Sequence, residues 1–141
     1  MKVVKQIKNS CFLACLESFL NDNNIFIEQS CMIKVLSNKG LCAEDGVVYF
    51  ENMNDICKTL NIKICAVNYH YPIENMYKNG SLLIVSTVPG FHCMRFYQQN
   101  EPEKIVVMDP AYPDENLRYC DKQETENSKP NFYHIEIFNK M

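Results

Sequence analysis

Apolar and polar positions recur along the chain with two different periods, first helical and then strand-like. Between Ser10 and about Asn21 the apolar residues form a wide helical stripe, which comprises Cys11, Leu13, Ala14, Cys15, Leu16, Phe19 and Leu20. A helix that is apolar over so much of its circumference is expected at the centre of a fold. The same spacing predicts two shorter helices, over Ser30–Asn38 and from about Val47 to Leu60.

The second half of the chain has the pattern of short β-strands. Five segments are rich in β-branched and aromatic residues and are bounded by Pro, Gly or Asn, namely Lys63–Tyr69, Ser81–Val88, His92–Gln98, Ile105–Met108 and Phe132–Phe138. Helices followed by strands predict an α+β fold, with N-terminal helices packed on a C-terminal, mostly antiparallel sheet. With 141 residues, no internal repeat and no long linker, residues 1–141 are expected to form a single domain.

Composition and charge narrow the classes of partner. The net charge of −3 and the lack of basic runs argue against nucleic acid. No stretch approaches the roughly 20 apolar residues of a membrane span. The N-terminal lysines and apolar run resemble a signal peptide, but Glu17 interrupts the run and no cleavage site follows. We therefore expect a soluble protein that is cytoplasmic, or is delivered into a host cytosol without an N-terminal signal.

Cysteine is abundant, with eight residues that are spread along the chain and mostly lie in apolar segments. Small disulfide scaffolds have denser cysteines in loop-rich sequence, so reduced thiols are the better expectation. Short Cys/His pairs with the spacing of zinc ligands are absent from the sequence. A redox or metal protein is therefore a minor alternative, and no cofactor is expected.

Four polar residues in apolar surroundings carry the candidate chemistry. Gln6 lies five residues before Cys11, and Ser10 is a candidate N-cap that would place Cys11 in the first turn of the central helix. Backbone N–H groups and the helix dipole lower the pKa of a thiol there, which favours the nucleophilic thiolate. Those N–H groups and the Gln6 amide can also donate to an oxyanion.

His92 and Asp109 are expected to meet across a β-hairpin. The turn-forming residues Gln99–Glu103 separate the strand that His92 opens from the strand that Asp109 closes. A turn centred between Asn100 and Glu101 would place His92 directly opposite Asp109, with their Cβ atoms ~5 Å apart. His92 would then accept the thiol proton, and Asp109 would fix the imidazole tautomer.

Three segments resemble the papain-like cysteine peptidases, most closely the bacteriocin-processing branch and its stand-alone domains. They are QIKNSCFLACL from Gln6, GFHCMRFY from Gly90 and IVVMDP from Ile105. The resemblance implies a papain-like fold and a thiol hydrolase of peptide or side-chain amide bonds. By position, it makes Cys11 the nucleophile, His92 the base, Asp109 the orienting acid and Gln6 the oxyanion residue. The implied partner is a protein or peptide substrate.

One position departs from the family pattern. Phe12 stands where glycine is usual, so a large side chain beside the nucleophile either narrows the cleft or marks a loss of catalysis. A catalytically inactive protein-binding module is therefore one alternative to a peptidase. A glutamine deamidase is another, because it would use the same nucleophile on a different carbonyl. Cys15 is a reserve nucleophile if the helix starts later, and Cys93 should face away from His92 and pack. His134 is a less favoured neighbour of the site.

Overall fold

The computed structural model describes residues 2–48, 52–67, 82–86, 91–101, 104–111, 117–121, 123–124 and 131–137. Within these residues, helices come first and strands follow. The helices are α1 (Cys11–Asp22), α2 (Gln29–Asn38) and α3 (Met53–Leu60). The strands are β1 (Ile62–Val67), β2 (Leu82–Ser86), β3 (Phe91–Glu101), β4 (Lys104–Met108), β5 (Arg118–Asp121) and β6 (Asn131–Ile137). The predicted α+β order is confirmed.

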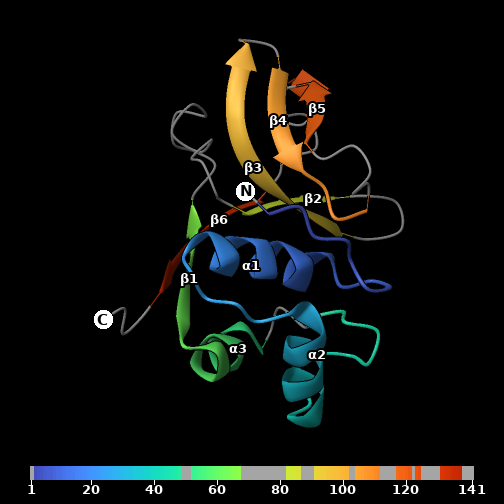
Figure 1. Cartoon of the computed structure of the whole chain (residues 1–141), viewed down its shortest axis with the longest axis vertical. Helices are drawn as coiled ribbons and strands as arrows, with labels where there is room; N and C mark the ends of the chain where they lie inside the picture. The colour runs from blue at the N-terminus through green and yellow to red at the C-terminus, as the bar shows by residue number, and fades with distance from the viewer. Residues whose placement is uncertain are drawn as a thin grey trace.

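The central position predicted for the first helix is also confirmed. In Figure 1, α1 crosses the middle of the molecule, with β3, β4 and β5 above it and α2 and α3 below it, while β1 runs down past it to α3. Its residues from Phe12 to Ser18 are all buried, and its apolar side chains form the largest part of the hydrophobic core. The wide apolar stripe therefore corresponds to a helix that is covered from several directions.

The third helix is shorter than its apolar pattern predicted. The prediction started it near Val47, but α3 begins at Met53. Val48 instead forms an isolated antiparallel bridge with Cys42, which closes a small loop over residues 42–48. Val48 is buried in this bridge, so its apolar character reflects loop packing rather than helical periodicity.

The six strands form one antiparallel sheet in the order β1-β6-β2-β3-β4-β5. β6 lies between β1 and β2, and β3 and β4 form the predicted hairpin, which rises at the top of Figure 1. β5 was missed from the sequence because its four residues show no alternation of buried and exposed positions.

The predicted register of the hairpin is wrong. Arg95 pairs with Met108, and Glu101 pairs with Lys104, so Asn100 and Glu101 belong to β3 instead of forming the turn. Two irregularities, between Phe96 and Gln98 and between Gln99 and Glu101, shift the pairing further. Bulges of this kind break the simple count of residues from a turn.

Buried charges help to dock β3 on α1. Arg95 of β3 is buried, and its guanidinium donates to the Ser18 hydroxyl at 2.9 Å and to the Asp22 carboxylate at 2.7 Å. The same guanidinium lies 5.5 Å from the centre of the Phe19 ring. Because a buried cation is costly unless it is paired, these contacts specify how the strand crosses the helix.

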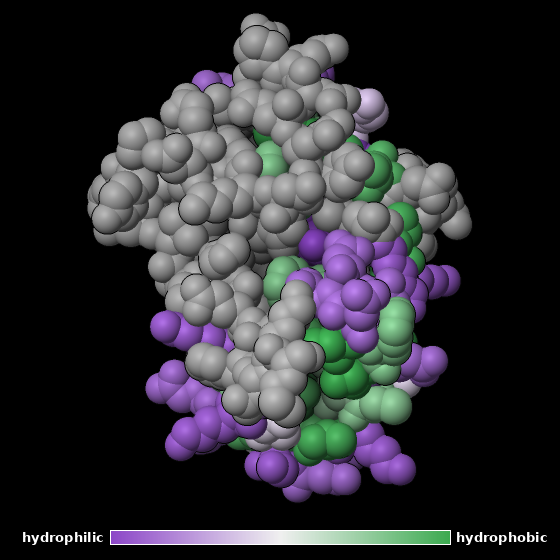
Figure 2. All heavy atoms as spheres, turned by 60° about the vertical axis from the view of Figure 1, so that its left-hand side comes forward, coloured by the Kyte–Doolittle hydropathy of each residue, from purple (hydrophilic) through white to green (hydrophobic). Residues whose placement is uncertain are grey.

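The surface is mixed in character. Figure 2 shows one face on which hydrophobic residues reach the surface in the lower half, with hydrophilic residues around them. Single exposed apolar side chains such as Phe26 and Val35 are normal on a folded surface. None of the helices in the described ranges is both long and apolar enough to cross a membrane.

Candidate active site

Cys11 is the first residue of α1 and is partly buried against the start of β3. The Cys93 backbone N–H donates to its sulfur at 3.4 Å, and the Phe12 backbone N–H also hydrogen-bonds to it. A side-chain hydrogen bond joins Cys11 to His92. The thiol therefore lies among donors that stabilise a negative sulfur.

Ser10 occupies the N-cap position but does not cap the helix with its side chain. Its hydroxyl accepts a hydrogen bond from the Ile7 N–H at 3.0 Å and donates to the Gln29 side-chain carbonyl at 2.6 Å. The predicted capping bond is therefore wrong, although the predicted start of the helix is confirmed. The Ser10 hydroxyl therefore does not engage the first turn of α1, where the Phe12 N–H hydrogen-bonds to the Cys11 sulfur.

His92 and Asp109 are hydrogen-bonded, with Nε2 of the imidazole 2.6 Å from Oδ1 of the carboxylate. In the observed register, one more pairing step along β4 would place Asp109 opposite Met94. His92 is then its diagonal neighbour on the same face of the sheet, a spacing that long side chains bridge. The two residues are thus brought together by a route different from the predicted one.

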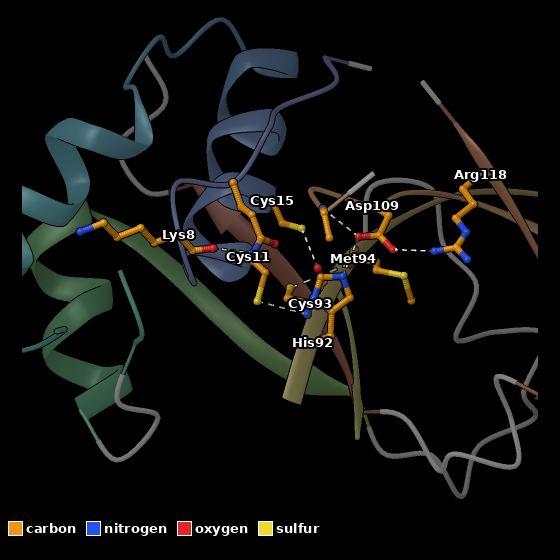
Figure 3. Close-up of polar contacts among 10 residues, drawn as sticks. Lys8, Cys11, Cys15, His92, Cys93, Met94, Asp109 and Arg118 are labelled. Carbon is orange, nitrogen blue, oxygen red and sulfur yellow. Dashed lines mark hydrogen bonds and ion pairs between the residues drawn. The ribbon is translucent and has the colours of Figure 1, made fainter. Parts of the chain in front are cut away.

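The hydrogen bond fixes the roles of the imidazole nitrogens. An ionised carboxylate can only accept, so Nε2 carries a proton and Nδ1 is left for the thiol. Figure 3 shows the order of the side chains, with Cys11 on one side of His92 and Asp109 on the other. Cys11 comes from α1, His92 from β3 and Asp109 from the position directly after β4.

Asp109 is held by more than the imidazole. Its side chain is 2% exposed, and Oδ1 also accepts from the Ala111 N–H at 3.0 Å. The Arg118 guanidinium donates to Oδ2 at 3.3 Å and lies beyond Asp109 in Figure 3. Sequence reasoning missed Arg118 because it lies in the strand that was not predicted.

The electrostatics of the site favour an ion pair. Burial raises the pKa of the Cys11 thiol, but hydrogen bonds from His92 and Cys93 outweigh it, so the pKa is below its usual value. Burial lowers the pKa of His92, whereas its contacts with Asp109 and Cys11 raise it to about 10. Burial likewise opposes ionisation of Asp109, yet the contacts with His92, Ala111 and Arg118 lower its pKa. Between the pKa values of Cys11 and His92, the thiolate and the imidazolium coexist.

Gln6 lies beside the end of β4, because its backbone N–H donates to the Pro110 carbonyl at 3.1 Å. Its side-chain Nε2 donates to the Lys8 carbonyl at 2.7 Å. Its Oε1 is buried without a hydrogen-bond partner. The amide is therefore fixed on the segment that leads into Cys11.

The other cysteines near the site are structural. Cys15 is fully buried one turn along α1, and its thiol donates to the Cys93 carbonyl at 3.5 Å, so it cannot serve as a reserve nucleophile. Cys93 is buried, as the strand alternation predicted. Phe12 is buried in the core cluster, so the core accommodates the side chain that departs from the family pattern.

The remaining candidates are the other thiols and His134. Seven cysteines whose side chains the structure describes form no disulfide, and the described ranges contain no group of three or more metal-ligating side chains. His134 lies in β6 opposite Cys65, but its side chain is outside the described part of the structure.

The fold matches the crystal structure of the peptidase domain of Streptococcus ComA, a bifunctional ABC transporter involved in a quorum-sensing pathway. The TM-score is 0.72 at 13% sequence identity, and the match covers 96% of this chain and 98% of that chain. No family model matches the sequence, and no curated protein matches it. The chain therefore has the papain-like α+β fold of that peptidase domain, and the resemblance seen in the sequence is confirmed at the level of the fold.

Proposed function

We propose that the protein is a cysteine hydrolase that cleaves a peptide or side-chain amide bond through Cys11, His92 and Asp109. One observation carries the proposal: a single imidazole hydrogen-bonds to the Cys11 thiol on one side and to the buried Asp109 carboxylate on the other. This is the arrangement of nucleophile, base and orienting group that covalent catalysis needs. The peptidase-like fold supports it.

In the first step, the Cys11 thiolate attacks the carbonyl carbon of the substrate. The negative charge moves to the carbonyl oxygen, where the N–H groups at the start of α1 and the Gln6 amide stabilise it. The His92 imidazolium then protonates the leaving amine as the C–N bond breaks. The product of this step is an acyl-enzyme on Cys11.

In the second step, water resolves the acyl-enzyme. His92, now neutral, takes a proton from the attacking water, and the C–S bond then breaks so that Cys11 leaves as a thiolate beside the restored imidazolium. Asp109 keeps Nε2 protonated throughout, so that Nδ1 always faces the reacting atoms. This mechanism requires no metal or cofactor.

The substrate is proposed to be a protein or peptide. A peptide bond and a glutamine side chain present the same carbonyl to the same nucleophile, so both peptidase and deamidase reactions follow from this chemistry. The test is incubation with a peptide library and mass spectrometry, with the Cys11→Ala protein as the control. New peptide ends indicate a peptidase, and glutamine-to-glutamate conversion at intact length indicates a deamidase.

Selective chemistry at Cys11 tests the proposal without a known substrate. Iodoacetamide at neutral pH should modify Cys11 much faster than the exposed thiol of Cys31, because only a thiolate reacts quickly. Equal rates at both cysteines would favour the catalytically silent binding module and would refute the hydrolase.

A further inference from the structure

A buried glutamine on α2 holds the turn that leads into the nucleophile. We call residues 5–10 the entry turn. Gln29 is only 5% exposed, and its Oε1 accepts hydrogen bonds from the Ile7 N–H at 3.1 Å and from the Ser10 hydroxyl at 2.6 Å. Its Nε2 donates to the Lys5 carbonyl at 2.5 Å. One side chain thus contacts both ends and the middle of the entry turn.

Gln29 is itself tied back to the helix that carries the nucleophile. Its backbone N–H donates to a carboxylate oxygen of Glu17, on α1, at 2.7 Å. The other oxygen of Glu17 lies 3.1 Å from the Lys2 ammonium. The connection runs from α1 through Glu17 to Gln29, and from there to the segment that precedes α1.

The entry turn needs such support because its backbone is unusual. Lys8 has a φ of +49°, a left-handed conformation that residues other than glycine adopt at a cost. This conformation accompanies the hydrogen bond from the Gln6 amide to the Lys8 carbonyl. An amide nitrogen has two hydrogens, so Gln6 retains a second one for a substrate oxygen.

We propose that Gln29 is a positioning residue, which fixes the entry turn and thereby aims the Gln6 amide at the oxyanion formed on a Cys11-bound substrate. The inference rests on the proposed function. It assigns Gln29 no contact with substrate. It predicts that loss of the Gln29 side-chain bonds impairs oxyanion stabilisation while the thiolate formed by Cys11 and His92 keeps its reactivity.

Two reactions of the Cys11 thiol distinguish oxyanion stabilisation from thiolate reactivity. Acylation by p-nitrophenyl acetate passes through a tetrahedral oxyanion, so it depends on the oxyanion donors. Alkylation by iodoacetamide displaces iodide without forming an oxyanion, so it reports only the thiolate. The ratio of the two rate constants at Cys11 therefore measures oxyanion stabilisation independently of the amount of thiolate.

The experiment compares this ratio among folded variants. Gln6→Ala should lower the ratio about 100-fold, the usual effect of losing one oxyanion donor. Gln29→Met, which keeps the volume but not the hydrogen bonds, should lower it about tenfold or more while alkylation changes little. Gln29→Glu keeps the acceptor oxygens and should give a smaller loss. In the Gln6→Ala background, Gln29→Met should cause no further loss, because Gln29 acts through Gln6.

Asp22→Asn serves as the matched control, because it removes an ion pair with Arg95 at the far end of α1. This variant should lower stability without changing the ratio. An unchanged ratio in folded Gln29→Met and Gln29→Glu overturns the inference while leaving the hydrolase intact. A ratio that falls equally in the Asp22→Asn control also overturns it, since the effect is then general destabilisation. Slow, unselective alkylation of Cys11 in the unaltered protein instead overturns the proposed function.

Discussion

The two sides of the candidate site are held by different kinds of interaction. On the thiol side, the entry turn before Cys11 is fixed by neutral hydrogen bonds that converge on the buried Gln29. On the imidazole side, His92 is fixed by the charged chain of Asp109 and Arg118. The hydrogen bonds of Gln29 are directional and end on backbone and hydroxyl groups that do not titrate, whereas the contacts of Asp109 raise the pKa of His92. The thiol side therefore controls geometry, and the imidazole side controls protonation.

Loss of the imidazole should have the largest effect, because it should slow both acylation and alkylation of Cys11. In His92→Ala the thiol loses the hydrogen bond and charge that lower its pKa, so both acylation and alkylation of Cys11 at pH 6 should fall, acylation by about 10²- to 10³-fold. Mass spectrometry of the modified peptides measures both rates. Cys31 is exposed and provides an internal standard that should not change. Undiminished alkylation of Cys11 would contradict the ion pair.

A substitution at Gly46, which lies close to Ser10, should disturb the geometry of the thiol side without changing the protonation of the site. Gly46 has a φ of +93°, and a Cβ added there would lie 2.3 Å from the Ser10 Cβ. Gly46→Ala should therefore cost about 2 to 4 kcal/mol of stability, measured by urea unfolding, and should slow acylation more than alkylation.

Gly40→Ala is the matched control for Gly46→Ala. Gly40 also has a positive φ, of +71°, but an added Cβ would meet open space. Its cost should be limited to about 1 to 2 kcal/mol of backbone strain, with no effect on either reaction. Equal costs for the two variants would show that the contact with Ser10 is unimportant.

The carboxylate should affect protonation more than geometry. Because Asp109 helps to raise the pKa of His92 to about 10, Asp109→Ala should lower that pKa and slow acylation about 10- to 100-fold. On raising the pH, the variant would then lose the imidazolium, and with it the ion pair, at a lower pH than the unaltered protein does. NMR titration of the His92 ring measures this directly. Asp109→Asn preserves a hydrogen-bond acceptor without the charge. If the pKa of His92 in that variant is as high as in the unaltered protein, the hydrogen bond alone raises it and the charge is not needed.

Arg118 should have the smallest effect, since its side chain is 39% exposed. Burial raises the pKa of Asp109, and its partners, Arg118 among them, lower it below the usual value. A carboxyl group whose pKa is lower in the folded protein than in the unfolded chain stabilises the fold at pH values above its unfolded-state pKa. That stabilisation is lost as the pH falls through the pKa of the same group in the folded protein. Arg118→Gln should therefore move acid unfolding to higher pH and change activity less than about fivefold. Circular dichroism at low and high salt tests this, because salt should reduce the difference.

The parts of the fold that depend on local pattern were predictable from the sequence. The stripe around Leu13 and Leu16 predicted the central helix, and the β-branched runs predicted five of the six strands. Boundaries failed where tertiary contacts override the pattern, as when Val48 pairs with Cys42 instead of joining a helix. The hairpin register failed because bulges are not encoded in residue counts.

The sequence pointed to only some of the residues that the structure brings together at the candidate site. Cys11, His92 and Asp109 stand out because their types suit nucleophilic chemistry and because they flank apolar segments. Gln29 and Arg118 do not stand out. A glutamine at the start of a helix and an arginine in a short strand resemble ordinary surface residues, and only the folded chain shows what they contact.

The place of β6 in the sheet has a consequence for the order of folding. β6 pairs with β1 on one side and β2 on the other, so the last strand in the sequence joins the edge next to α3 to the strands that carry His92 and Asp109. Contacts between residues as distant as Ile62 and Ile137 form slowly, because a long loop must close first. During synthesis the sheet stays divided until β6 has been made. The edge strand β1 is therefore joined to the strands near the thiol only through β6, which follows all of them in the sequence.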